Sequence, residues 1–596
     1  MDYNLFHMSA DEYDVVIVGS GAAGMTAALA AAYAGLRAVV IEKAAHFGGS
    51  TARSGGGVWI PNNEVLEAAG VSDTPEAARQ YLHAIVGDVV PAERIDTYLE
   101  RGPDALSFVL RNSPLAMQWV PDYSDYYPEA PGGRLGGRSV EPKPFNGKRL
   151  GPELANLEPD YGKAPLNIAV TQADYRWLNL VVRHRKGPAR VLRVGLRWLV
   201  AHLGRRHLLV RGQAMAGALR AGLADAGVPV LLETALVDLQ TEAGAVTGVV
   251  VEQRGAQWVL SARHGVLLAS GGFEHNAEMR ALYQRRPVGT AWTVGAPANT
   301  GDGIRAGAKL DAALDLMDDA WWGPSIPLSG GPWFCLAERA LPGGIMVNAR
   351  GERFMNEAAP YVEAVHRMYG GEFGRGDGPG ENIPAWLIID QQYRNRYVFA
   401  GLTPRQAFPG RWYKAGALVT AQSIAELAER MGVPADALVA TVERFNEFAR
   451  AGTDEDFSRG ESGYDRYYGD PRVKPNPSLA PVERGPFYAV TMVPGDLGTK
   501  GGLRTDVAGR VLREDGSVIE GLYAAGNTSA PVMGHTYAGP GATIGPAITF
   551  GYLAALDIAR RAAMPHGGAE RTAMPHGGVE RTAAATTTSE ELDGAH

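Results

Sequence analysis

Several features of secreted, membrane-spanning and nucleic-acid-binding proteins are missing from this sequence. It has one cysteine in 596 residues, Cys335, which excludes an internal disulfide and a cysteine metal cluster. No apolar run is long enough to cross a bilayer, and the polar residues 1–12 are unlike a signal peptide. The 57 basic and 65 acidic residues nearly balance, so nothing indicates a nucleic-acid partner. We expect a cytoplasmic protein with no transmembrane segment and no metal site.

Basic residues nevertheless gather in two places, residues 183–193 and 205–207, with Trp177, Leu192 and Trp198 close by in the sequence. Basic and apolar side chains together could make a peripheral contact with membrane lipids. A solvated basic face explains the same residues and is the more common case. Both interpretations stay open.

The most informative pattern lies in residues 13–42. Residues 15–18 predict a buried strand, a glycine-rich turn follows, and an alanine-rich helix reaches Ala34 before a second strand at 37–41. Strand, tight turn, helix and strand in this order are typical of a dinucleotide-binding unit.

Each glycine of the turn has its own predicted role. Gly19 permits the sharp turn, Gly21 lets a pyrophosphate approach the backbone, and Gly24 lets the helix pack on the strand. Glu42 ends the second strand, where a carboxylate would accept the hydroxyls of an adenosine ribose.

A second loop rich in glycine, serine and threonine follows directly, at residues 43–57. Its backbone N–H groups and hydroxyls suit a long, buried cofactor, so FAD is favoured over a diffusible nicotinamide. A flexible surface loop is the alternative interpretation of this segment alone.

Further along the chain, residues 74–110 have helical spacing, and residues 122–138 form a loop with three tyrosines. Strands are predicted at 228–232, 235–239, 246–251, 257–261 and 265–270, and helices at 212–226, 421–431, 435–448 and 544–561. The strand at 265–270 runs into Gly271, which would bring the backbone near the cofactor again. Residues 299–303 either direct N–H groups at the cofactor or are an ordinary helix start with Asp302 in its first turn.

The fold class predicted from these patterns is α/β. A Rossmann-like FAD-binding domain, discontinuous in sequence, is expected at residues 1–321 and 494–562. An inserted α+β domain is expected at 322–493, where the sequence is richer in aromatic residues and has proline- and glycine-rich joints. Residues 563–596 repeat AMPHGGAERT as AMPHGGVERT, which predicts a disordered tail rather than a weak metal site.

Five motifs resemble one family of flavoenzymes. They are SGGGVWIPNN (54–63), YSDYYPEAPGGR (123–134), ERFMNEAAPY (352–361), GDLGTKGGLRTD (495–506) and AGNTSAPVMGHTYAGPGATIGPA (525–547). With the glycine fingerprint they resemble the fumarate reductase and succinate dehydrogenase superfamily and, within it, the 3-ketosteroid Δ1-dehydrogenases. The resemblance covers residues 13 to about 562.

This resemblance implies non-covalent FAD and an inserted domain that is catalytic. The residues expected to hold FAD are Gly19, Gly21, Ala22, Ala23, Gly24, Glu42, Lys43, Gly49, Ser50, Ser54, Gly55, Gly56, Val237, Gly271, Asp302, Gly526, Asn527, Gly541 and Ile544. The family's three active-site tyrosines map to Tyr126, Tyr361 and Tyr537, and Gly541 adds a backbone N–H. Ala538 departs from the family, which usually has proline there, so the steroid fit could differ.

The implied reaction removes a proton from C2 and a hydride from C1 of a 3-ketosteroid, a step of steroid ring-A breakdown. Tyr537 and Gly541 would hold the C3 oxygen as an oxyanion hole, and Tyr361 would take the C2 proton with help from Tyr126. The hydride would go to flavin N5, and an external acceptor such as a quinone would reoxidise the flavin.

A dicarboxylate reductase on this scaffold would need arginine and histidine groups around two carboxylates. Here the corresponding elements carry apolar and aromatic residues, namely Trp119, Tyr127, Phe334, Val532 and Met533. Two alternatives remain: a related ketosteroid dehydrogenase or reductase acting at C4–C5, and a non-catalytic flavoprotein that binds steroids.

Overall fold

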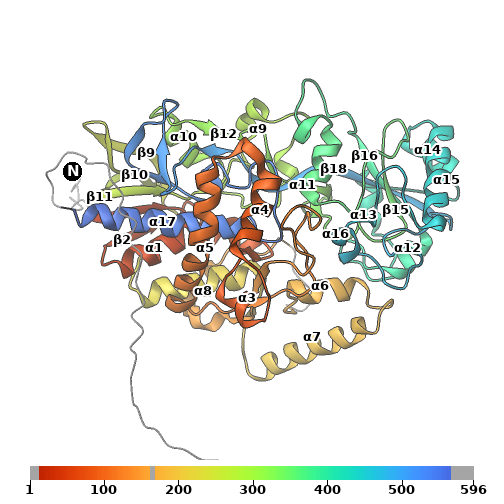
Figure 1. The fold of residues 1–596 in the computed structure, drawn as a ribbon, viewed down its shortest axis with the longest axis horizontal. Coiled ribbons are helices and arrows are strands. Elements are labelled where there is room, and N and C mark those ends of the chain that lie inside the picture. Colours follow the sequence, from red (N-terminus) through yellow and green to blue (C-terminus); the bar gives the residue numbers. More distant parts are fainter. Residues whose placement is uncertain (1–11, 162–167, 565–596) are drawn as a thin grey trace, which may run out of the picture.

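The computed structural model describes residues 12–161 and 168–564. The two largest β-sheets lie toward opposite ends of the long axis of the molecule (Figure 1). The repeated tail predicted at 563–596 lies outside the described residues from position 565 onward. None of the helices in the described ranges combines the length and apolarity that crossing a bilayer requires.

The first sheet is mostly parallel and confirms the predicted α/β class. Its strands follow the order β20-β21-β11-β1-β2-β8, and only the edge strand β20 runs antiparallel within this path. Their bounds are β1 (Glu12–Val18), β2 (Ala38–Ile41), β8 (Val230–Leu231), β11 (Ala256–Leu268), β20 (Arg510–Leu512) and β21 (Val518–Ala524). The apolar strands β1 and β2 are buried because helices cover the sheet, as expected for a parallel sheet.

The sequence predicted two separate strands, at 257–261 and 265–270. This was wrong, because both segments belong to the single strand β11. The first half of β11 pairs with β10 (Ala245–Gln253), which pairs with β9 (Ala235–Glu242), both antiparallel. Its second half pairs with β1 in parallel, with Gly265 opposite Val15. One strand therefore belongs to both the antiparallel ribbon and the parallel sheet.

Two long helices pack on each other beside the first sheet (Figure 1). They are α1 (Ala22–Tyr33) and α17 (Ile544–Ala562). A Cβ atom at Gly551 would lie 2.5 Å from the Ala23 carbonyl oxygen, so the backbones are in direct contact. The helix predicted at 74–110 is instead two helices, α4 (Pro75–Val86) and α5 (Ala92–Asn112), because Gly87 takes φ +62° and Pro91 precedes α5.

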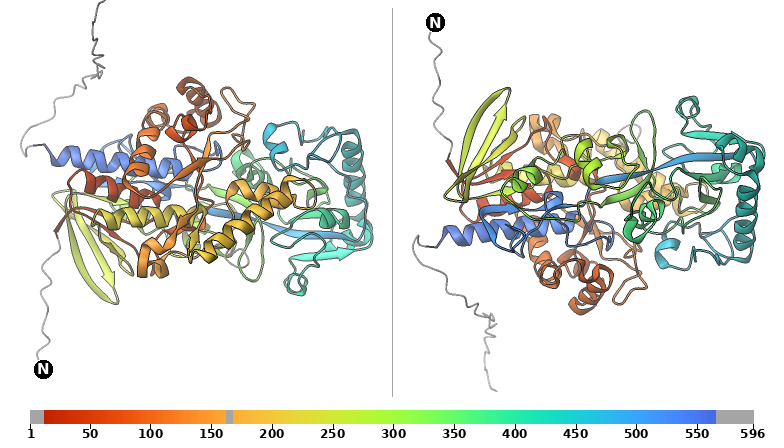
Figure 2. Two further views of the ribbon diagram at one scale, coloured as in Figure 1. Left: turned by 90° about the horizontal axis from the view of Figure 1, so that it is seen from below. Right: turned by 90° about the horizontal axis from the view of Figure 1, so that it is seen from above.

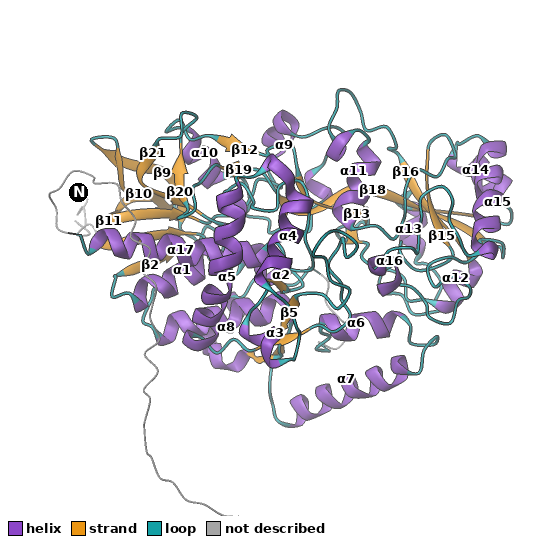
Figure 3. Cartoon of the chain, viewed as in Figure 1, coloured by secondary structure: helices purple, strands orange, loops and turns teal. Residues whose placement is uncertain are grey.

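The second sheet is antiparallel and has the order β14-β13-β18-β16-β15, with β17 also paired to β18. Helices α14 (Ile424–Met431) and α15 (Ala435–Ala451) form its outer layer at the far end of the molecule (Figure 3). The strands are β13 (Ala320–Ile326), β14 (Trp333–Phe334), β15 (Gly344–Asn348), β16 (Ala385–Asp390), β17 (Leu418–Ala421) and β18 (Phe487–Thr499). Of these strands the sequence predicts only β15, because residues 345–347 are apolar and a turn at 349–351 follows them.

The long strand β18 extends from the second sheet toward the middle of the molecule (Figure 2). It pairs with β13, and Ala320 lies opposite Thr499. The predicted domain boundaries at 321/322 and 493/494 fall inside these two strands. The paired strands β13 and β18 therefore join the inserted segment to the part of the chain that carries the first sheet. The division into domains stays a prediction.

The remaining main elements lie between or around the two sheets. They are α2 (Gly49–Arg53), β3 (Val58–Trp59), α3 (Glu64–Ala68), β4 (Met117–Trp119), β5 (Ser139–Pro142), α6 (Gln172–Asn179), α7 (Lys186–Leu203), α8 (Arg211–Asp225), α9 (Ala277–Tyr283), α10 (Asp302–Ala308), β12 (Leu314–Asp315), α11 (Tyr361–Tyr369), α12 (Gln391–Arg396), α13 (Gly410–Lys414), α16 (Gly463–Tyr467) and β19 (Gly502–Leu503).

Candidate active site and cofactor cavity

A cavity of about 670 Å³ connects the glycine-rich turn after β1 with the three tyrosines named above. Residues of the first sheet, the loop after β2, the start of α17, and β13, β14 and α11 at the second sheet all contribute to its wall. This continuity is what a cofactor needs when one end is anchored by the fingerprint and the other reacts with substrate.

Glu42 lies immediately after β2 and lines one end of the cavity. Its Oε2 accepts hydrogen bonds from the Ser20 N–H and hydroxyl at 3.1 and 2.6 Å, and its Oε1 accepts from the Ala44 N–H. The neighbouring Lys43 forms an ion pair of 2.6 Å with Asp302, the first residue of α10. Lys43 and Asp302 therefore join the loop after β2 to α10.

The glycine turn passes a geometric test for holding a cofactor. A Cβ at Gly19 would lie 2.3 Å from the Ala269 carbonyl oxygen, and one at Gly24 would lie 2.0 Å from the Gly19 carbonyl oxygen. A Cβ at Gly21 would meet only the Thr51 hydroxyl, at 3.5 Å. Close packing within the protein explains why Gly19 and Gly24 are glycines. Gly21 instead faces open space at the start of α1, where the helix dipole favours an anionic group.

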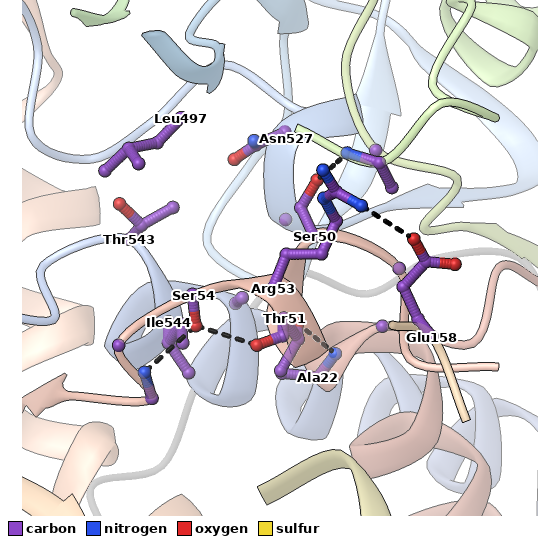
Figure 4. Close-up of a pocket in the computed structure, with 18 of the residues that line it drawn as sticks. Ala22, Ser50, Thr51, Arg53, Ser54, Glu158, Leu497, Asn527, Thr543 and Ile544 are labelled. Carbon is purple, nitrogen blue, oxygen red and sulfur yellow. Dashed lines mark hydrogen bonds and ion pairs between the residues drawn. The ribbon is translucent and has the colours of Figure 1, made fainter. Parts of the chain in front are cut away.

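Side chains of α2 form a polar wall of the cavity (Figure 4). Thr51 accepts a hydrogen bond from the Ala22 N–H, and Ser50 accepts from the Ala296 N–H. Arg53 forms an ion pair of 3.1 Å with Glu158, a carboxyl group whose pKa is raised by burial. Arg53 and Glu158 were not predicted from the sequence, since the two residues are far apart in the chain.

Most residues expected to hold FAD line the cavity. They are Gly19, Gly21, Ala22, Ala23, Glu42, Lys43, Gly49, Ser50, Ser54, Gly55, Gly56, Gly271, Asp302, Gly526, Asn527, Gly541 and Ile544. Two do not: Gly24 packs within the turn, and the Val237 side chain is 40% exposed on β9, with Leu236 at the cavity wall in its place. Neighbouring residues of a strand point to opposite faces, so a shift of one position explains this difference.

At the other end of the cavity the three tyrosine rings form a triangle. Ring centroids are 5.5 Å apart for Tyr126 and Tyr361, 5.4 Å for Tyr126 and Tyr537, and 5.4 Å for Tyr361 and Tyr537. All three rings are buried. Because these residues come from a loop, α11 and the segment before α17, only the tertiary fold brings them together.

Each tyrosine is held by its own local structure. The Tyr126 N–H donates to the Ala538 carbonyl at 3.0 Å, which links the loop at 122–138 to the segment that carries Tyr537. Tyr361 is the first residue of α11, directly after Pro360. The Tyr537 hydroxyl accepts a hydrogen bond of 3.0 Å from Thr543. The sequence analysis did not single out Thr543, although it lies two residues after Gly541.

The electrostatic surroundings disfavour a free phenolate. Burial raises the pKa of Tyr126 and Tyr361 well above the ordinary value and also raises the pKa of Tyr537. A hydrogen bond with Tyr126 acts in the opposite direction on Tyr361. The Tyr464 ring lies 4.7 Å from Tyr126 and was missed by the sequence analysis, although the run YDRYY around it is rich in tyrosine.

Aromatic rings surround the three tyrosines. Phe334 lies 5.2 Å from Tyr361, and Trp321 lies 5.2 Å from Tyr537, centroid to centroid. Of the five apolar residues singled out in the sequence, Phe334 lines the cavity, whereas Trp119, Tyr127, Val532 and Met533 are not among its lining residues. Two of these four, Val532 and Met533, are fully buried core residues.

A buried charged cluster lies behind Trp321. Asp319 accepts hydrogen bonds from Lys500 at 3.0 Å and contacts His366 at 3.0 Å and His535 at 2.9 Å. These partners hold the pKa of the Asp319 carboxyl well below its ordinary range against the effect of burial. The Lys500 ammonium group lies 5.0 Å from the centre of the Trp321 ring. The cluster is thus a support of the cavity wall, separated from the cavity by an aromatic ring.

Comparison with known proteins agrees with this geometry. A family model described as FAD binding domain matches residues 14–544. The chain is 64% identical over 569 residues to a 3-oxosteroid 1-dehydrogenase of Mycolicibacterium smegmatis, covering 95% of this chain and all of the relative. It is 65% identical over 563 residues to the enzyme of that name from Mycobacterium tuberculosis, covering 94% of this chain and all of the relative.

A solved structure is also similar along nearly the whole chain. It is the 3-ketosteroid delta1-dehydrogenase of Sterolibacterium denitrificans in complex with 1,4-androstadiene-3,17-dione, with a TM-score of 0.87 and 40% identity. The match covers 92% of this chain and all of that chain. With a fingerprint that leaves room for a cofactor and a family model across most of its length, the chain belongs to the FAD-binding flavoenzyme family of the 3-oxosteroid 1-dehydrogenases.

Proposed function

We propose that this enzyme introduces a double bond between C1 and C2 of 3-ketosteroids. The observation that carries the proposal is the triangle of Tyr126, Tyr361 and Tyr537 in the same cavity as the dinucleotide fingerprint. The names of the relatives and the steroid in the Sterolibacterium complex support it.

Activation of the ketone falls to Tyr537 and Gly541. The Tyr537 oxygen accepts a hydrogen bond from the Thr543 hydroxyl, so its own O–H can donate to the C3 oxygen. Gly541 takes φ +100° and lies against residues 57–58, which fixes the direction of its N–H group. Two such donors stabilise the developing enolate, and loss of one typically costs about 3 kcal/mol of transition-state stabilisation.

Tyr361 is the base that takes the C2 proton. Burial raises its pKa, so the fold must supply compensating stabilisation for the phenolate. Its place at the start of α11 is near the positive end of the helix dipole, and Tyr126 supplies a hydrogen bond. Bound FAD supplies the acceptor for the hydride that leaves C1, and an external acceptor such as a quinone takes the electrons onward.

The substrate end of the cavity suits a flat apolar molecule. Its wall includes Val120, Trp333, Phe334 and Leu336. The two arginines of the cavity wall, Arg53 and Arg211, are already paired with the carboxylates of Glu158 and Asp160. A dicarboxylate would lack the cationic partners that such a substrate needs there.

The direct test is anaerobic addition of a 3-ketosteroid to the FAD-loaded enzyme. Loss of the flavin absorbance means hydride transfer, whereas a spectral shift without bleaching means binding alone and contradicts the proposal. A panel of ring-A isomers with product analysis then separates 1,2-desaturation from reaction at C4–C5. A product with a new C4–C5 double bond would assign the enzyme to the related activity instead.

Tyr361→Phe tests the base. We expect the rate of flavin reduction to fall by about three orders of magnitude while steroid binding persists, because the ring stays and the acceptor of the proton is lost. Tyr413→Phe is a matched control, since Tyr413 lies on α13 and is 40% exposed. A nearly normal rate in Tyr361→Phe would remove Tyr361 from this role.

A further inference from the structure

Helix α7 projects from the body of the molecule on one side (Figure 1). Its outer face is apolar, although it meets solvent. The exposed side chains are Val191, Leu192, Leu196, Leu199, Val200 and Leu203, which are between 44% and 74% exposed. An apolar stripe of this size on a protein surface marks a site of interaction.

Two of the three arginines of α7, Arg190 and Arg197, face inward instead, and Arg193 is exposed. Arg190 and Arg197 form ion pairs of 3.0 and 2.8 Å with Asp174 of α6, a fully buried carboxylate. Arg197 also donates to the Ala169 carbonyl. This is the reverse of an ordinary surface helix, whose charged side faces water. The ion pairs hold the helix in an orientation that presents its leucines outward.

We propose that the outer face of α7 docks on the surface of a membrane containing anionic lipids. Four exposed arginines, Arg185, Arg193, Arg205 and Arg206, flank the apolar stripe, and within the described ranges none forms an ion pair with a carboxylate. Anionic headgroups complement these arginines while the leucines enter the acyl boundary. A second copy of the chain would bring the same arginines together, so the charge pattern favours lipid over self-association.

The position of α6 places the proposed membrane contact beside the cavity. The conclusion about the steroid substrate rests on the proposed function. One side of α6 contacts α7, and residues at its start line the cavity: Thr171, Gln172 and Tyr175. A membrane that covers α7 would therefore lie next to this wall of the cavity. Steroids partition into bilayers because they are apolar, so the substrate would reach the cavity from the lipid phase.

The test uses FAD-loaded enzyme and vesicles. We expect the enzyme to sediment with vesicles of phosphatidylcholine and phosphatidylglycerol, more weakly with phosphatidylcholine alone, and less as salt rises. The double variant Leu192→Glu/Leu196→Glu should bind about a hundredfold more weakly, since two leucines no longer enter the membrane. Leu282→Glu is the matched control, because Leu282 is 72% exposed on α9 and lies outside the stripe.

Two further measurements separate the possible outcomes. Steroid supplied in vesicles should be turned over more slowly by the double variant than by the parent, while dissolved steroid is turned over equally. Failure of the parent to bind either kind of vesicle would overturn the docking proposal, as would a dimer that dissociates in the double variant. If the proposed function is wrong, the result is different: steroid does not reduce the flavin of the parent enzyme under any condition.

Discussion

Single residues set the protonation state of this site. Tyr361 and Tyr126 are buried beside other aromatic rings, and both phenols have a pKa well above the ordinary value of about 10. At neutral pH both are therefore protonated in the absence of bound groups. Only a small fraction of Tyr361 is then deprotonated and able to serve as the proposed base, and that fraction increases with pH.

The rate of flavin reduction by saturating 3-ketosteroid should consequently rise with pH. Below the pKa of Tyr361 the deprotonated fraction grows by about tenfold for each pH unit, and the rate should follow it. Stopped-flow absorbance between about pH 6 and about pH 9 measures this slope. A rate that is flat or falls across the range would show that a group with a lower pKa takes the proton.

Sequence reasoning at this scale reached the tyrosines by their motifs but missed their partners. Thr543, Tyr464 and Arg53 act through contacts with distant segments, namely Tyr537, Tyr126 and Glu158. Local patterns hold no information about such pairings. Val237 illustrates the same limit. Its strand was predicted, but the neighbouring residue Leu236 faces the cavity and Val237 faces solvent.

Secondary-structure elements determine which glycines serve the fold and which serve the cofactor. The turn between β1 and α1 contains both kinds, as the space around each missing Cβ indicates. Gly24 is in contact with the turn itself, whereas Gly21 faces the cavity.

The variants Gly21→Ala and Gly24→Ala should therefore behave differently. Gly21→Ala should fold with nearly unchanged stability and lose FAD on dialysis, because the methyl group occupies space near the start of α1. Gly24→Ala should lower the stability of the protein by about 1–3 kcal/mol, since its Cβ would overlap the Gly19 carbonyl. The thermal midpoint of each variant measures its stability, and its flavin content after dialysis measures whether FAD is retained. Equal loss of stability in the two would contradict the assignment of Gly21.

The predicted elements agreed well with the structure where no glycine–proline pair interrupts the segment, as for β1, α1, β2 and α15. The strands β13 and β18 escaped prediction because each contains adjacent glycine and proline residues, which are typical of turns rather than strands.

At the scale of the whole molecule, Asp319 ties together segments that meet at the junction of the two sheets. His366 comes from α11, Lys500 follows β18, and His535 belongs to the loop that leads to Tyr537. Removing the central carboxylate would leave a buried ammonium group without its partner, which is strongly unfavourable.

We expect Asp319→Asn to lower the free energy of unfolding by about 3–5 kcal/mol. Asp315→Asn is the control, because the Asp315 side chain is 39% exposed and its ion pair with Arg504 should contribute no more than about 1 kcal/mol. Denaturant unfolding of both variants measures the difference. Similar stabilities would mean that the cluster is not a structural junction.

Removal of residues 565–596 should change neither steroid binding nor turnover. The last described helix, α17, ends at Ala562, and the cavity lining comes from residues before that point. Steady-state kinetics of a chain ending at Met564, compared with the full chain, tests this expectation. A changed turnover number would give the repeated tail a role beyond that of a spacer.

The sequence by itself determined the dinucleotide unit and the identity of the cofactor, and it indicated the tyrosines that are proposed to react. These depend on local order: a glycine at a turn, an acid at the end of a strand, a tyrosine in a recognisable motif. Only the tertiary structure decided that Tyr126, Tyr361 and Tyr537 meet, that Arg53 pairs with Glu158, and that the leucines of α7 face outward. The physical reason is that packing and ion pairing between remote segments select the orientation of each side chain, which periodicity along one segment leaves open.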